Sequence, residues 1–249
     1  MENFKWLVLC CVLFAMPVQA TSLGVWPINP RIDPPESSTS IWVRNNSQDM
    51  SVVLQVRVLA WSQDEDTDIY AIQNQLVVSP AMARVAPGAQ QLFRIVNRRG
   101  AVKVEQHELS YRVLIDEIPQ PDSINQSTLN FQMRYSLPLF IGFADMDHNN
   151  MTADKQQVLE AGLRYELIDG KAPRLRIHNH SRLHARISHL KVVRPGQKDA
   201  VLFSGLVGYV LPDASQSWDI DKERWQLLQA AGAYLVFQQE RRELKIAVK

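Results

Sequence analysis

The fold is decided by the stretch TLNFQMRYSLPLFI, residues Thr128 to Ile141. Successive side chains of a β-strand point to opposite faces, so the alternation in this stretch places apolar residues on one face and mostly polar residues on the other. The stretch is about twice as long as a usual strand. The apolar row consists of Leu129, Phe131, Met133, Tyr135, Leu137, Leu139 and Ile141.

A strand of this length fits two interpretations. It is either the central strand of a sandwich core, or an edge strand whose apolar row is offered to another chain. Pro138 has no backbone N–H, which favours an edge position or a point where strand pairing stops. The alternation alone leaves both interpretations open.

Short alternating segments separated by turn residues recur on the N-terminal side of this stretch, and no segment before Asp221 has a helical period. The pattern is typical of an all-β sandwich. The strands expected in this part are 23–28, 40–44, 51–61, 90–96 and 109–117.

The alternation stops after Ile141, where a polar segment follows. Such a change predicts a domain boundary. We expect a first domain over residues 21–143 and a second β-sandwich domain over residues 149–249. The second domain is expected to contain strands at 162–167, 174–178, 185–193, 200–210, 231–237 and 243–248, with a short helical turn at 221–230.

Residues 1–20 have the pattern of a secretory signal peptide. Lys5 precedes an apolar run over 6–16, and the small Ala20 suits cleavage before Thr21. No later stretch approaches the roughly 20 apolar residues of a transmembrane helix. We therefore expect an exported chain that does not insert into the membrane.

Several function classes find no support in the residues. Cys10 and Cys11 both lie in the signal segment, which excludes a disulfide scaffold, a thiolate metal site and a cysteine nucleophile from the exported chain. No serine stands in a Gly-x-Ser-x-Gly motif, and carboxylates such as Asp116 and Glu117 alternate across a strand. The formal net charge of +1 gives no support to nucleic-acid binding. We expect no catalytic residues and no cofactor.

A metal-dependent enzyme is a weaker alternative. His178, His180, His184 and His189 lie within a dozen residues. No pair of carboxylates stands nearby to complete a site, so we interpret them as surface histidines of a hairpin and expect no metal. The acidic run 64–68 lacks the spacing of a calcium loop and is interpreted as a solvated hairpin tip.

In their order and spacing, these features resemble the periplasmic chaperones of the chaperone–usher pathway, the PapD-like proteins. The absence of cysteine from the exported chain and the sequence Leu-Pro-Leu-Phe over 137–140 point to a divergent or archaic branch. The residues that carry the resemblance are 23–31, 84–89, 93–95, 111–119 and 128–141, with a fainter likeness at 175–181 and 208–213.

The resemblance implies two immunoglobulin-like β-sandwich domains in a boomerang arrangement and a non-enzymatic role in pilus (fimbrium) biogenesis in the periplasm. Such chaperones stabilise pilus subunits by donor-strand complementation and deliver them to an outer-membrane usher. Subunits and usher are therefore the expected partners, and the exposed apolar row predicts a self-capping homodimer in the idle protein. By match to the family pattern, the donor residues are Leu129, Phe131, Met133, Tyr135 and Leu137.

The family also anchors the C-terminal carboxylate of the subunit with two basic residues in the cleft between the domains. Arg31 matches the first, whereas the second, a lysine in the family, is Pro138 here. Arg134 lies on the same strand face and is our candidate replacement, because a guanidinium can bind a carboxylate through two parallel hydrogen bonds. Arg94 and Glu117 match a structural ion pair near the domain junction.

A further hypothesis has the same strand pattern. An extracellular structural or adhesive protein with tandem immunoglobulin-like domains would also show alternating strands and no catalytic residues. The two hypotheses differ in location, because the chaperone stays in the periplasm and the structural protein lies outside the outer membrane.

Overall fold

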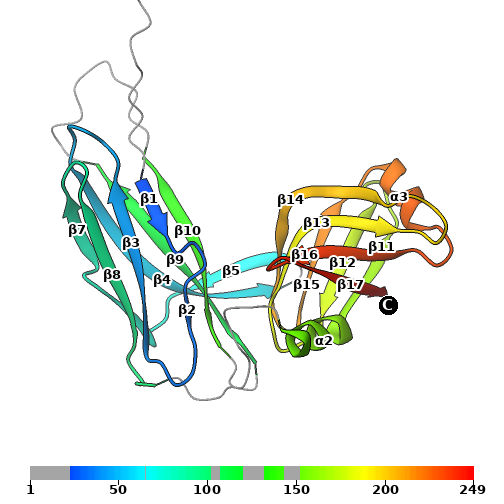
Figure 1. Ribbon diagram of the computed structural model, residues 1–249, viewed down its shortest axis with the longest axis horizontal. Helices are drawn as coiled ribbons and strands as arrows, with labels where there is room; N and C mark the ends of the chain where they lie inside the picture. The colour runs from blue at the N-terminus through cyan, green and yellow to red at the C-terminus, as the bar shows by residue number, and fades with distance from the viewer. Residues whose placement is uncertain (1–22, 65, 102–106, 120–131, 143–151) are drawn as a thin grey trace, which may run out of the picture.

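The computed structural model describes residues 23–64, 66–101, 107–119, 132–142 and 152–249. These residues form two β-sandwich domains that lie at an angle to each other, with an open space between their upper parts (Figure 1). The predicted class, two immunoglobulin-like domains, is confirmed. No helix in the described part of the chain is long and apolar enough to span a membrane.

The first domain packs two sheets face to face, and all their strand pairs are antiparallel except that of β10 with β2. The smaller sheet has the order β1-β3-β8-β6, with β1 (Leu23–Trp26), β3 (Ser38–Asn45), β8 (Gln90–Asn97) and β6 (Leu76–Ser79). The larger sheet has the order β2-β10-β9-β4-β5, and β7 also pairs with β4. Its strands are β2 (Arg31–Ile32), β10 (Arg134–Ile141), β9 (Leu109–Ile118), β4 (Val52–Asp64), β5 (Thr67–Ala71) and β7 (Met82–Val85).

Strand parity builds the core of the first domain. In β4, Leu54 and Val56 are buried between the sheets, whereas Arg57 lies on the opposite face. Phe93 of β8 and Ile115 of β9 fill the same core without exposure to solvent. Each such side chain contributes roughly 1.5 to 3 kcal/mol of burial energy, so the domain needs no disulfide.

The second domain is one continuous sheet that curls around its own core. Its strand order is β14-β13-β16-β17-β11-β12-β15. Leu175, Ile187 and Phe237 are among its fully buried residues. The strands are β11 (Leu163–Ile168), β12 (Arg174–Asn179), β13 (Ala185–Val193), β14 (Ala200–Val210), β15 (Ala214–Asp219), β16 (Tyr234–Gln239) and β17 (Arg242–Val248).

Two short helices accompany the described strands. Helix α2 (Ala153–Gly162) begins at Thr152, whose hydroxyl accepts a hydrogen bond from the backbone of Lys155. Helix α3 (Lys222–Leu228) is capped by Asp221 and was expected as a helical turn. Helix α2 was not expected, because its pattern of buried residues is too sparse to show a helical period.

The long stretch 128–141 is only partly a strand in the described structure. Strand β10 begins at Arg134, residues 132 and 133 have no regular structure, and residues 128–131 lie outside the described residues. The short strands β5, β6, β7 and β15 were also not expected from the sequence. With four to six residues each, they show too few alternations to be distinguished from turns.

Candidate functional site

Strand β10 has one paired edge and one that is largely open. It pairs with β9 along its whole length, but with β2 only at Phe140 and Ile141. The N–H groups of Phe140 and Gly142 donate to the carbonyls of Pro30 and Ile32 on the β2 side. Backbone N–H and C=O groups alternate in direction along a strand. The even-numbered residues of β10, such as Phe140, therefore direct their N–H and C=O groups away from β9.

Arg134 and Ser136 share this parity, are exposed and face the open edge, whereas Pro138, which has the same parity, is buried. No other described strand pairs with β10 at these positions. Arg134 and Ser136 offer both N–H and C=O, whereas Pro138 offers only C=O. The edge is therefore a template for β-strand addition that loses one donor at Pro138.

The predicted donor residues divide into three groups. Leu129 and Phe131 lie outside the described residues, and Met133 is 46% exposed. Tyr135 packs on the core of the first domain, and Leu137 lies inside that core with 8% exposure. The prediction for Tyr135 and Leu137 is corrected, because the apolar face of β10 fills the core of its own domain.

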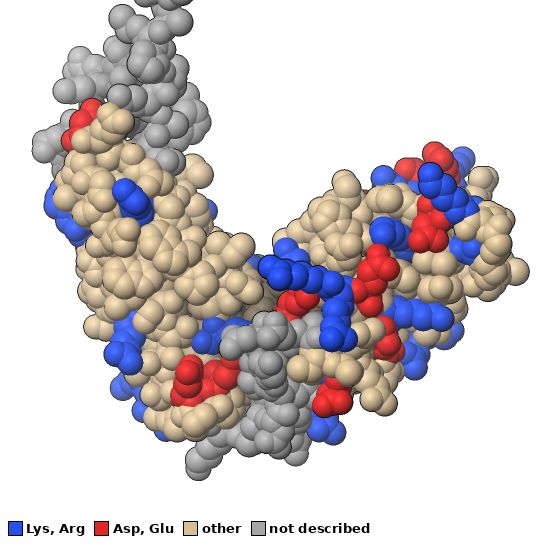
Figure 2. Space-filling view, in the orientation of Figure 1, with Lys and Arg blue, Asp and Glu red and all other residues tan. Residues whose placement is uncertain are grey.

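An aromatic cluster joins the two domains. Trp61 and Phe140 from the first domain are buried with Leu211 from the second. The rings of Phe140 and His184 are stacked with their centroids 3.6 Å apart, and Tyr209 meets Trp61 edge to face at 5.6 Å. The outer face of the larger sheet therefore forms one wall of the space between the domains, whose hollow is visible in Figure 2.

Glu108 forms a buried ionic bridge across this junction. Its side chain is 0% exposed. It accepts hydrogen bonds from Arg31 Nη2 at 2.6 Å and from the backbone N–H of His184 at 2.9 Å, and it contacts His184 Nδ1. Burial alone raises the pKa of Glu108, but the charges and hydrogen bonds of His184 and Arg31 outweigh it and lower the pKa to about 2. We call Glu108, Arg31 and His184 the buried latch.

Arg31 lies at the domain junction, but its guanidinium is already paired. Besides Glu108, it has Asp33 at 3.5 Å from Nε. The cavity that Arg31 lines with Glu108, Lys155 and His184 has a volume of about 10 Å³, which is room for one water at most. A partner's carboxylate does not fit beside Arg31 in this conformation.

Arg134 lies far from Arg31. In register, Phe140 stands beside Arg31, and Arg134 stands six residues earlier on β10, about 20 Å away at the usual strand rise. Arg134 forms an ion pair with Asp116, which also pairs with Arg57 at 2.7 Å. The predicted anchor of Arg31 with Arg134 is therefore corrected, because the structure does not bring the two side chains together.

Arg112 of β9 is the cation that the sequence reasoning missed. It stands beside Pro138 in register, and its guanidinium lies 3.8 Å from the ring centroid of Trp61 and 5.6 Å from that of Tyr209. Its Nε is buried without a hydrogen-bond partner, and no described carboxylate lies within ion-pair distance. The only sign of this position in the sequence was that Arg112 has the opposite strand parity to the core residue Val113, which places it on the outer face of the sheet.

Arg112 lines a pocket between the domains with a volume of about 410 Å³. A guanidinium that stacks over an indole ring can still form hydrogen bonds with its N–H edge, and that of Arg112 interacts with the hydroxyl of Tyr70. The pocket therefore presents a fixed positive charge that a carboxylate can bind through two hydrogen bonds. Its walls come from both domains: Trp61, Gln63, Asp66, Asp68, Leu206, Val207, Gly208, Tyr209, Gln216 and Trp218.

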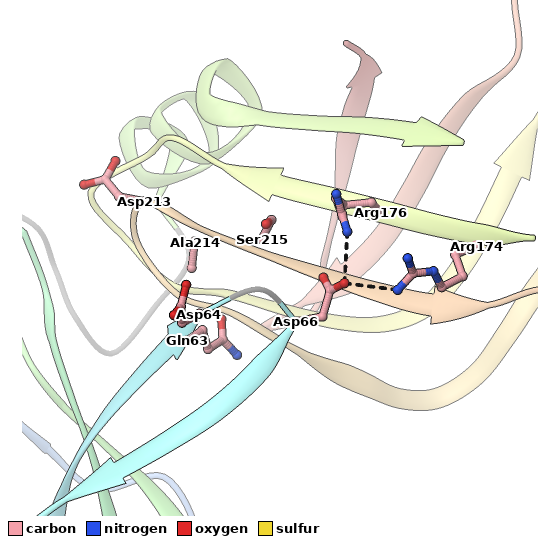
Figure 3. A pocket seen from close by; sticks show the side chains of 8 residues that line it. All are labelled: Gln63, Asp64, Asp66, Arg174, Arg176, Asp213, Ala214 and Ser215. Atoms are coloured by element: carbon pink, nitrogen blue, oxygen red, sulfur yellow. Dashed lines mark hydrogen bonds and ion pairs between the residues drawn. The ribbon is translucent and has the colours of Figure 1, made fainter. Parts of the chain in front are cut away.

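The hairpin of β4 and β5 reaches from the first domain to the second (Figure 3). At its tip, Asp66 Oδ2 accepts hydrogen bonds from Arg174 Nη1 at 3.3 Å and Arg176 Nη2 at 3.0 Å, and Asp66 Oδ1 accepts one from Ser217 Oγ at 2.9 Å. The interpretation of residues 64–68 as a solvated hairpin tip is therefore wrong for Asp66. Its hydrogen-bond partners lie on β12 and β15, far away in the sequence, so the local sequence pattern could not indicate them.

A second contact lies three residues earlier in the same hairpin. Gln63 Nε2 donates to the carbonyl of Tyr209 at 3.0 Å, and Gln63 Oε1 accepts from the N–H of Leu211 at 2.9 Å. One side chain thus satisfies two backbone groups of the second domain. The hairpin lines a second pocket of about 500 Å³, formed by Gln63, Asp64, Asp66, Arg174, Arg176, Asp213, Ala214 and Ser215 (Figure 3).

The predicted ion pair of Arg94 and Glu117 is not formed. Arg94 donates two hydrogen bonds to the hydroxyl of Ser38 within the smaller sheet. Glu117 lies in the other sheet, at the end of β9 away from the junction, and burial raises its pKa, the opposite of what a nearby cation would do. The ionic contacts that cross the junction include those of Glu108, of Asp66 and of His107 with Asp213.

The four histidines do not form one cluster. The rings of His178 and His180 lie parallel at 6.0 Å, and His178 Nε2 lies 3.0 Å from Glu166. His184 is buried at the junction, which corrects its interpretation as a surface residue, and His189 Nδ1 accepts a backbone hydrogen bond. Among the described residues, no group of three or more His, Cys, Asp or Glu is placed to hold a metal ion.

The fold and the junction define a two-domain, immunoglobulin-like protein with an open strand edge beside an interdomain cleft. Residues 31–142 match the family model described as "Pili and flagellar-assembly chaperone, PapD N-terminal domain". The first domain therefore matches the PapD-like family of pilus-assembly chaperones, the family that the sequence resembles. No curated protein matches the chain.

Solved structures of similar fold cover nearly the whole chain. A chain of the CsuC–CsuE chaperone–tip adhesion subunit pre-assembly complex, from archaic Csu pili of Acinetobacter baumannii, is 25% identical, with a TM-score of 0.68 and coverage of 92% of this chain and 99% of that chain. The SafA pilin–SafB chaperone complex of Salmonella enterica shares the fold at 16% identity and a TM-score of 0.59, with coverage of 92% of this chain and 97% of that chain. The CupB2 chaperone of Pseudomonas aeruginosa shares it at 14% identity and a TM-score of 0.56, with coverage of 89% of this chain and 97% of that chain.

Proposed function

We propose that this chain is a periplasmic chaperone that binds a pilus subunit by adding one of the subunit's strands to the open edge of β10. The observation that carries the proposal is that no described strand pairs with the backbone of Arg134 and Ser136 on the side of β10 away from β9. The CsuC–CsuE structure is a complex with a tip adhesion subunit and the SafA–SafB structure is a complex with a pilin, which supports a pilus subunit as the partner.

In this proposal the apolar row N-terminal to β10 enters the subunit. Met133 is exposed and shares its parity with Leu129 and Phe131, which precede it. Burying three such side chains contributes on the order of 5 to 9 kcal/mol before ordering costs. Tyr135 and Leu137 stay in the core and hold the strand on its own domain.

We assign the binding of the subunit's terminal carboxylate to Arg112. The assignment is supported by the absence of a described carboxylate partner and by the pocket that Arg112 lines. Arg31 in this view is a junction residue, because Glu108 already neutralises it.

The remaining parts of the proposal extend from the family. We expect export by residues 1–20, domains over 21–143 and 149–249, delivery to an outer-membrane usher, a self-capped homodimer in the idle protein and no catalysis. The likeness to a structure from archaic Csu pili supports assignment to the archaic branch.

The open edge is tested by Ser136→Pro, with Ser136→Ala as the matched control. Ser136 is exposed and its N–H faces the open edge, so proline removes an external donor and no internal hydrogen bond. We expect Ser136→Pro to weaken binding of a pilus subunit of the same organism at least about tenfold, and Ser136→Ala to bind like wild type. Equal affinity of all three proteins in titration calorimetry would exclude strand addition at this edge.

The carboxylate site is tested with the same subunit in two forms, one with a free C-terminal carboxylate and one with a C-terminal amide. The amide should bind wild type about tenfold more weakly, because the charge-assisted hydrogen bonds of Arg112 are lost. Arg112→Gln should bind both forms with the same reduced affinity, and Arg134→Gln should keep the full difference between them. A persistent difference in Arg112→Gln would show that another residue binds the carboxylate.

A further inference from the structure

The tip of the β4–β5 hairpin is shaped to reach the second domain. Asp66 adopts a left-handed backbone conformation with φ of 71°, which aspartate tolerates better than most residues. This conformation lies at the turn between the two strands, and the carboxylate is directed at Arg174 and Arg176 (Figure 3). We call Gln63 and Asp66 with these partners the hairpin clasp.

The hairpin clasp differs from the buried latch in exposure. The side chain of Asp66 is 18% exposed, and those of Arg176 and Arg174 are 28% and 39% exposed. Ion pairs in contact with water exchange easily with solvent and weaken as salt rises. The clasp can therefore open while Glu108 and the aromatic cluster still hold the domains together.

The clasp also stands between two cavities of the cleft. Gln63 and Asp66 line both the pocket of about 500 Å³ and the pocket of about 410 Å³ that contains Arg112. The hairpin is thus a shared wall, and the opposite walls belong to the second domain. Movement of the second domain away from the hairpin would change the width of the pocket in front of Arg112.

We infer that the hairpin clasp sets the angle between the two domains and thereby the width of the cleft in which the subunit binds. Asp66 is a positioning residue that acts through Arg174 and Arg176. The buried latch and the aromatic cluster serve as the hinge. The first part of the inference stands on the contacts alone, and the link to subunit binding rests on the proposed function.

The angle can be measured by electron spin resonance distances between two labels. Outside Cys10 and Cys11 the sequence has no cysteine, so Gln90→Cys on the first domain and Lys198→Cys on the second provide the only label sites in the exported chain. Both positions are exposed and lie away from the hairpin. The background protein carries both substitutions, and each test variant is added to it.

Asp66→Asn should broaden the distribution of distances between the labels, and Asp49→Asn, an exposed aspartate of the same domain, should not. At about 1 M salt, charges are screened beyond roughly 3 Å. The distance distribution of the background protein should then broaden toward that of Asp66→Asn, and the distribution of Asp66→Asn itself should change little. Arg174→Gln with Arg176→Gln removes the same ion pairs from the other side and should give the same broadening. An unchanged distribution in both variants would overturn the clasp.

Subunit affinity tests the second part separately. Asp66→Asn should weaken subunit binding by about three- to tenfold at low salt, with the unfolding midpoint nearly unchanged, and Asp49→Asn should bind like the background protein. Broadened distances with unchanged affinity would overturn the link between domain angle and binding. If Ser136→Pro also left affinity unchanged, the proposed function itself would fail, whereas the label distances would still decide the clasp.

Discussion

Two of the ionic contacts that join the two domains differ in environment. In the buried latch, Glu108 has no exposure to solvent and binds Arg31 and His184. In the hairpin clasp, Asp66 binds Arg174 and Arg176 at the rim of an open pocket (Figure 3). Both cross the same junction, yet their expected contributions to stability are unequal.

The difference follows from desolvation. A buried charge that loses its partner has no water to replace it, so removing one member of a buried pair is costly. An exposed pair that breaks regains hydration, and its net contribution is small. The latch is thus suited to keeping the domains together, and the clasp is suited to adjusting their angle.

The largest expected effect comes from breaking the latch. Glu108→Ala leaves Arg31 and His184 partly buried without their shared anion, and we expect a loss of about 3 to 5 kcal/mol in the free energy of unfolding. Urea unfolding followed by tryptophan fluorescence measures it. A loss below about 1 kcal/mol would show that the latch behaves like a surface pair.

The pH dependence of stability sharpens the comparison. The folded pKa of Glu108 is about 2, below its ordinary value of 4.5, so its contribution is fully present above about pH 4.5 and is lost as the pH falls toward 2. Over this window wild type should lose on the order of 3 kcal/mol more than Glu108→Gln. The free energy of unfolding is measured by urea unfolding at each pH. The same dependence on pH in wild type and Glu108→Gln would contradict the lowered pKa of Glu108.

The smallest effect is expected at the clasp. Asp66→Asn should lower the free energy of unfolding by only about 0.2 to 1 kcal/mol, because its ion pairs are exposed to solvent. The difference from wild type should shrink further at about 1 M salt. If Asp66→Asn lowered the free energy of unfolding as much as Glu108→Ala, the clasp and the latch would stabilise the junction equally.

Strand positions were largely predictable from the sequence. Strands β13 and β14 begin and end where the alternation does, and β9 differs from its expected range by one residue. More buried and less buried residues alternate over parts of these strands, and the alternation is interrupted where the pairing of β13 with β14 is irregular. Helix α2 and strand β15 lack such a contrast and were missed.

The candidate site was predictable only in part. The apolar row and the edge character of Pro138 follow from strand parity and from the missing proline N–H. Arg31 lies at the junction, and its pairing with Glu108 joins residues 77 apart in the chain. Arg112 and Asp66 were overlooked, because nothing near them in the sequence shows which second-domain residues they face.

The sequence by itself determined the all-β class, the strand that ends the first domain and the lack of any thiol after Cys11. These are local properties, set by side-chain alternation and residue type. Only the tertiary structure decided which charges are neutralised and which remain available, because Arg31, Arg134 and Arg112 look alike in the chain. Charge pairing depends on distances between segments far apart in sequence, and those distances exist only once both domains are folded and joined.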